Sequence, residues 1–99
     1  MRESTKRYKN ARDFGHSLGL NEVDMELIHQ KKRLIEELKK ARQKRKLSQA
    51  ELAKRVSSQQ PAIARMESGQ VSEVSMDFLL KVAIALQVSV SIRPFEDAA

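Results

Sequence analysis

The segment LSQAELAKRVSSQQPAIARMESG, residues 47–69, has the pattern of two short helices joined by a tight turn. Ser48 is a favourable N-cap for the first helix. Glu51, three residues later, completes a capping box, in which each side chain bonds the backbone N–H of the other residue. Beyond the cap, apolar residues recur at spacings of three and four, the period of one helix face. We expect this helix to cover residues 48–56.

The second helix of the segment, expected over residues 60–67, begins with polar side chains. Pro61 is tolerated only in the first turn of a helix, so the helix starts near Gln59 or Gln60. Its outward positions hold an amide, two small residues and a guanidinium: Gln60, Ala62, Ala64 and Arg65. A helix with this surface can enter a groove closely and hydrogen-bond base edges, which is typical of a helix-turn-helix that recognises DNA.

Length and composition limit the possible functions. The 99 residues suffice for one small domain with one modest core. The absence of Cys excludes disulfides, thiolate zinc sites and cysteine nucleophiles, and His16 and His29 are interpreted as surface residues. The sequence has no phosphate-binding loop, no nucleophile motif and no apolar run that could span a membrane. We therefore expect a cytoplasmic, nucleoid-associated protein that is not an enzyme and has no metal or cofactor.

Positive charge is concentrated in two parts of a chain whose net charge is +6. Residues 31–46 carry nine bases against two acids, and residues 1–12 carry five bases against one acid. Such clustering favours phosphate contact with release of counterions, although a Lys-rich helix face can also be merely solvated. We expect backbone contacts to double-stranded DNA from the basic residues of this cluster, including Lys44 and Lys46.

The remaining pattern divides the chain into three parts. Residues 1–20 have no sustained apolar period and are expected to be a flexible arm. Residues 21–87 are the expected DNA-binding domain, which opens with a long helix capped by Asn21. The apolar face of that helix lapses near residues 30–32. Residues 88–99 are the expected C-terminal strand and tail, which serve dimerisation.

The last helix, expected over residues 76–86 after the cap Ser75, is apolar on almost every side. We therefore expect this helix to be buried on two faces, one against its own domain and one against a second copy of the protein. Val88, Val90 and Ile92 then alternate with polar residues, which indicates a short half-buried strand. Such a strand either pairs with an edge in another molecule or is merely extended chain. The expected homodimer contacts are Phe78, Leu79, Val82, Val88, Val90 and Ile92.

Three phrases, LSQAELAKRV, QPAIARMESG and LLKVAIALQVSV, resemble the helix-turn-helix domains of Xre-type phage repressors and bacterial regulators. The resemblance covers residues 34–90. It implies an all-α, lambda-repressor-like fold of five helices, to which our pattern adds the C-terminal β-strand. It also implies that the third helix of the domain enters the major groove, usually as part of a two-fold dimer.

The resemblance assigns roles to single residues. Gln60 stands where a Gln pairs with adenine, and Gln49 where a Gln supports it and touches phosphate. Ser48, as the N-cap of the same helix, is also placed for phosphate contact. Arg65 matches an outward position that often contacts a base. Arg42 and Glu67 match an internal ion pair that holds the first helix of the domain to the third.

The sequence departs from the family pattern in the turn, where Ser57 replaces the usual Gly. A non-Gly residue at positive φ is uncommon, so two alternatives stay open. Either Gln59 precedes the helix as its N-cap and Gln60 contacts the base, or Ser58 becomes the cap and the two glutamines exchange exposure.

An N-terminal extension, the phrase QPAIARMESG and a terminal strand are together similar to HigA-type antitoxins. The strand is also similar to that of HipB-type antitoxins, where it pairs across the dimer. This resemblance implies a protein that neutralises a toxin, here through residues 1–30, and represses its own operon. The alternatives are a stand-alone regulator without a toxin, and an interaction scaffold whose basic face binds RNA or stays solvated.

Overall fold

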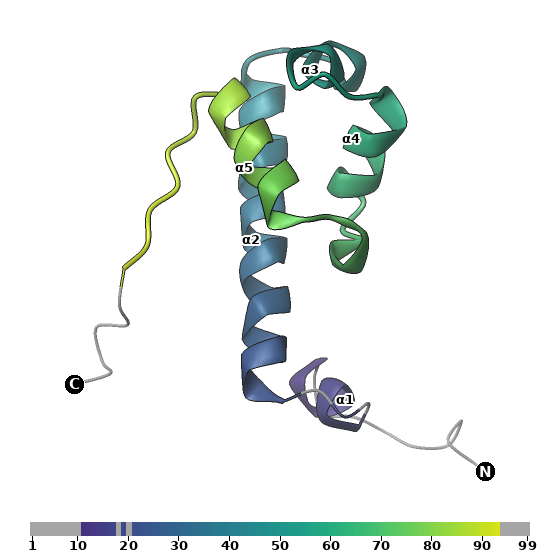
Figure 1. Ribbon diagram of the computed structural model, residues 1–99, viewed down its shortest axis with the longest axis vertical. Helices are drawn as coiled ribbons and strands as arrows, with labels where there is room; N and C mark the ends of the chain where they lie inside the picture. The colour runs from purple at the N-terminus through teal and green to yellow at the C-terminus, as the bar shows by residue number, and fades with distance from the viewer. Residues whose placement is uncertain (1–10, 18, 20, 94–99) are drawn as a thin grey trace. The chain divides into compact units, whose positions relative to one another are not determined.

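The structure is a computed structural model that describes residues 11–17, 19 and 21–93. Along the chain these residues form α1 (Ala11–Ser17), α2 (Glu22–Lys44), α3 (Gln49–Arg55), α4 (Gln60–Glu67), the 3-10 helix η2 (Val71–Glu73) and α5 (Met76–Ala85) (Figure 1). The chain divides into two compact units, residues 1–30 and 31–99, with the boundary inside α2. None of the described helices is both long and apolar enough to cross a membrane.

The first unit contains α1 and the beginning of α2. We expected a flexible arm over residues 1–20; residues 11–17 of it are helical, and residues 1–10, 18 and 20 lie outside the described residues. Gly19 follows α1 at φ 88°, and its N–H donates to the carbonyl oxygen of His16 at 2.9 Å. A helix of two turns is too short to show a period in the sequence, so its position was not predicted. The Asn21 side chain caps α2 by accepting from the N–H of Asp24 at 2.8 Å.

The boundary between the units lies ten residues later than the expected start of the domain, next to the residues where the apolar face of α2 lapses. The core of the second unit combines apolar side chains of α2, α3, α4 and α5. Its buried members are Ile35, Leu38, Leu52, Ala53, Val56, Ile63, Met66, Val74, Leu79, Val82, Ala83 and Leu86. The helical spacing of apolar residues in the sequence thus predicted the inward faces of α3 and α4 correctly.

The secondary structure of the second unit differs from the expected five helices and a strand. Its described residues, 31–93, contain the C-terminal part of α2, then α3, α4, the short η2 and α5, while α1 belongs to the first unit. Residues 88–93 have no regular secondary structure. A strand needs a hydrogen-bonded neighbour, and the described residues of a single copy offer none. Val88 instead packs against the core, and Val90 and Ile92 are exposed.

Two of the expected homodimer contacts were wrong. Leu79 and Val82 are 0% exposed, so neither has surface left for a second copy. The outward apolar residues of α5 are Met76, Leu80 and Ile84, of which Ile84 is 77% exposed. The sequence could not separate the two faces of this helix because nearly all of its residues are apolar.

Lys31 connects α2 by hydrogen bonds to the segment that follows α4. Its ammonium donates to the carbonyl oxygens of Val71 and Val74 at 3.0 and 2.6 Å. No pattern in the sequence predicted these bonds, since their acceptors are main-chain atoms forty or more residues away. They anchor η2, which connects the end of α4 to α5.

Candidate nucleic-acid interface

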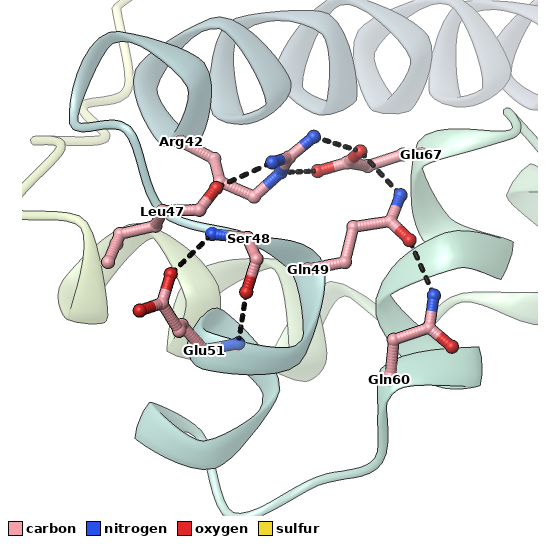
Figure 2. A network of polar contacts seen from close by, with 7 residues as sticks. All are labelled: Arg42, Leu47, Ser48, Gln49, Glu51, Gln60 and Glu67. Atoms are coloured by element: carbon pink, nitrogen blue, oxygen red, sulfur yellow. Dashed lines mark hydrogen bonds and ion pairs between the residues drawn. The ribbon is translucent and has the colours of Figure 1, made fainter.

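Helix α3 begins with the capping box that the sequence predicted. The hydroxyl of Ser48 accepts from the N–H of Glu51 at 3.0 Å, and the N–H of Ser48 donates to Oε1 of Glu51 at 2.7 Å (Figure 2). The bond from the Ser48 backbone, helped by its hydroxyl, holds the pKa of Glu51 below its ordinary value of 4.5. A carboxylate whose pKa is lowered by folding stabilises the folded state at pH values above its ordinary pKa. That stabilisation is lost as the pH falls through the lowered pKa. The cap is therefore intact at neutral pH.

The turn between α3 and α4 keeps a left-handed residue even though it lacks the usual glycine. Ser57 has φ 56°, and the N–H of Ser58 donates to the carbonyl oxygen of Ala53 at 2.8 Å. A non-Gly residue in this region costs about 1–2 kcal/mol. Gln59 is the N-cap of α4 without a capping side-chain bond, and Gln60 is the first helical residue. Of the two alternatives for this turn, the structure has the one in which Gln59 precedes the helix.

An ion pair joins the end of α2 to the end of α4. Nε and Nη2 of Arg42 donate to the two carboxylate oxygens of Glu67 at 2.6 and 3.0 Å, and Nη1 donates to the carbonyl oxygen of Leu47 at 2.6 Å. The side chains of Arg42 and Glu67 are only 13% and 4% exposed. The bond to Glu67 raises the pKa of Arg42, although burial opposes the shift. The pair expected from the resemblance is present, and it is bidentate, which adds geometric specificity.

Two glutamines extend this ion pair toward the surface. Nε2 of Gln49 donates to Oε1 of Glu67 at 3.0 Å, and Nε2 of Gln60 donates to Oε1 of Gln49 at 2.6 Å. Figure 2 shows the resulting series of hydrogen-bonded side chains, in which Oε1 of Gln60 points away from Gln49. Gln49 therefore supports Gln60, as the resemblance implied. The sequence did not predict that Gln49 also bonds Glu67, because the pair and the amides belonged to separate motifs.

The other expected interface residues lie at the surface of the same unit. Exposed residues among them are Lys44, Lys46, Ser48, Gln59, Gln60 and Arg65, whereas Gln49, Ala62 and Ala64 are half-buried. Lys46 follows the end of α2 at φ 58°, and its N–H donates to the carbonyl oxygen of Gln43 at 3.0 Å. Among the described residues, no group of His, Asp and Glu could hold a metal ion.

The geometry of α3, the turn and α4 can be compared with known proteins. A family model described as helix-turn-helix matches residues 38–92, which is more than half of the chain. The match includes both helices of the motif, the turn, and α5. No curated protein and no solved structure matches the chain.

Proposed function

The chain belongs to the Xre-like helix-turn-helix family of DNA-binding transcriptional regulators, and on that premise we propose that it is a sequence-specific repressor. In this proposal a homodimer binds an inverted-repeat operator, with two α4 helices in successive major grooves about 34 Å apart. Members of the family are generally not enzymes. Because the proposed ligand is operator DNA, we further propose that the protein is found at the nucleoid.

The observation that supports base recognition best is the state of Gln60. Its amide is exposed at the start of α4, yet one of its N–H groups is engaged by Gln49. One N–H and the carbonyl oxygen remain for a ligand. That donor–acceptor pair is complementary to N7 and N6–H of adenine, which a Gln side chain contacts in a bidentate manner. In this proposal Arg65 and Gln59 also contact bases, and Ala62 and Ala64 allow close approach.

Selection from a random pool of DNA duplexes tests this function directly. The purified protein should enrich an inverted repeat, and the enriched duplex should bind at least about a thousand times more tightly than random DNA. Transfer RNA and bulk RNA serve as competitors. Selection of no motif, or binding to RNA as tight as to the enriched duplex, would instead favour an RNA-binding or scaffold role.

Lys44 and Lys46 are proposed to contact phosphates at the end of α2. Replacing either by Gln should weaken binding to every sequence alike, since phosphate contacts do not depend on the bases. The slope of log K against log salt concentration, which is negative, should become less negative by about 1 for each lost contact. Titration of the selected duplex at several salt concentrations measures this slope, with Lys81→Gln on α5 as the control. An unchanged slope would exclude phosphate contact by that lysine.

The proposed dimer uses the outward face of α5, with Met76, Leu80 and Ile84, together with Val90 and Ile92 beyond it. Covering these side chains would remove apolar surface from water, the main favourable term in most protein association. Ile84→Glu should place a charge in the interface and yield a monomer with weaker operator binding. Ile84→Leu is the control, because it keeps the apolar surface. Sedimentation equilibrium measures both, and an Ile84→Glu protein that stays dimeric would contradict this face.

The regulator is further proposed to be an antitoxin that neutralises a toxin through residues 1–30 and represses its own operon. Support comes from exposed apolar side chains in the first unit, Val23 and Leu27 on α2, because such residues suit a protein partner. Co-expression with the neighbouring open reading frame tests this. The two proteins should co-purify, and Leu27→Glu should abolish the complex while operator binding persists. A toxin-free operon would identify a stand-alone regulator.

A further inference from the structure

We propose that Glu67 determines base specificity although it lies two hydrogen bonds away from Gln60. Its carboxylate fixes which end of the Gln49 amide faces it, and Gln49 in turn fixes which end of the Gln60 amide faces outward. Glu67 and Gln49 are then positioning residues for recognition. The inference rests on the proposed base contact of Gln60.

Amide orientation matters because the two ends of a Gln side chain have almost the same shape and opposite hydrogen-bonding character. A Gln60 amide with its oxygen and one N–H available in the observed order complements adenine. Turned by half a rotation, the same amide would place its oxygen against N7 and its N–H group against N6–H. Both contacts would then be repulsive, so a freely rotating amide would select adenine poorly.

The charge of Glu67 excludes the turned orientation at Gln49. An ionised carboxylate only accepts hydrogen bonds, so Gln49 has to present Nε2 to it. Glu67 is held in place by Arg42, and only 4% of its side chain is exposed. Little water can therefore replace Gln49 as its partner.

The orientation of the Gln49 amide in turn determines that of the Gln60 amide. With Nε2 of Gln49 facing Glu67, the oxygen of Gln49 faces Gln60 at 2.6 Å and requires a donor. If the Gln60 amide alone were turned, its carbonyl oxygen would face the carbonyl oxygen of Gln49, and neither could donate a hydrogen bond. If both amides were turned, the carbonyl oxygen of Gln49 would face the carboxylate of Glu67, which is equally unable to donate. The observed orientation is the only one that satisfies all three side chains (Figure 2).

Gln49→Met is the first test, because it interrupts the chain and leaves the ion pair between Arg42 and Glu67 in place. We expect the preference for the adenine contacted by Gln60 over guanine at that position to fall about tenfold. The variant should remain folded at the assay temperature. Loss of the proposed phosphate contact of Gln49 should also weaken binding to all duplexes alike, and this general loss does not alter the preference. Gln70→Met is the matched control, because Gln70 is an exposed glutamine that takes no part in these side-chain hydrogen bonds. Full retention of the preference, or an equal loss on every duplex, would overturn the proposal.

A second comparison separates specificity from stability. Arg42→Met leaves the carboxylate as an acceptor, whereas the double variant with Glu67→Gln replaces it by an amide that can donate or accept. At pH 8 and at a temperature where circular dichroism shows both folded, the single variant should keep the adenine preference. The double variant should lose it although it is the more stable of the two. If the more stable double variant kept the adenine preference and the less stable single variant lost it, the proposal would be overturned.

A different result would identify failure of the proposed function itself. If the unmodified protein selects no motif, or Gln60→Ala affects all duplexes alike, base contact by Gln60 is absent and this inference fails with it. If Gln60→Ala removes the adenine preference and Gln49→Met does not, the base contact stands and only the positioning role of Gln49 and Glu67 is refuted.

Discussion

Arg42→Met should lower the free energy of unfolding by about 3–5 kcal/mol, because it leaves the buried carboxylate of Glu67 without its partner. The variant also removes the donor to the carbonyl oxygen of Leu47, which connects α2 to the start of α3. Domains of this size are stable by only about 5–15 kcal/mol, so the variant should be partly unfolded at moderate temperature. Urea denaturation followed by circular dichroism measures the loss.

The double variant Arg42→Met with Glu67→Leu is the control for this cause. It buries no charge, and replacing a buried ion pair by apolar residues is often neutral. It should therefore recover much of the stability that Arg42→Met loses. An ion pair exposed at a protein surface contributes at most about 1 kcal/mol. A loss of that size for Arg42→Met would show that the buried pair contributes no more than a surface one.

Gln60→Ala should reduce binding to the selected duplex by about 1–3 kcal/mol, a factor of about 5–150, with little effect on random DNA. The reason is that the amide contributes to base contacts and not to the phosphate contacts that all sequences share. Titration of both duplexes at one salt concentration measures the two effects. Gln70→Ala is the matched control, and equal losses on both duplexes would refute base recognition by Gln60.

Gln59 offers an internal comparison within the same experiment. It precedes α4, is exposed, and makes no capping side-chain bond, so it lacks the support that Gln60 receives from Gln49. Gln59→Ala should therefore reduce specific binding less than Gln60→Ala. The reverse order would assign the main base contact to Gln59.

Features governed by a few neighbouring residues could be predicted from the sequence. The capping box of Ser48 and Glu51 needs only a spacing of three, and Pro61 permits only the first turn of a helix. The inward faces of α3 and α4, including Leu52 and Ile63, followed from the period of a helix. The pairing of Arg42 with Glu67 needed a family pattern in addition, because the two are twenty-five residues apart.

Other features depend on contacts that no local pattern contains. The uniform apolar character of α5 concealed which side faces the core, and Leu79 and Val82 were misassigned to the dimer for that reason. The alternation after residue 87 suggested a strand, but pairing depends on a neighbour and not on alternation. Ser57 adopts a conformation that its own preferences disfavour, because the surrounding turn bonds outweigh the local cost.

Local sequence alone was therefore enough to place a helix pair, the cap of its first helix and its polar outer surface, since hydrogen bonds and side-chain spacing within one or two turns control them. The tertiary structure alone brought Glu67 beside Gln49 and Gln49 beside Gln60. These contacts join residues eleven and eighteen positions apart, and only the packing of α3 against α4 aligns their atoms within hydrogen-bonding distance. The orientation in which Gln60 meets a ligand is thus a property of the folded domain.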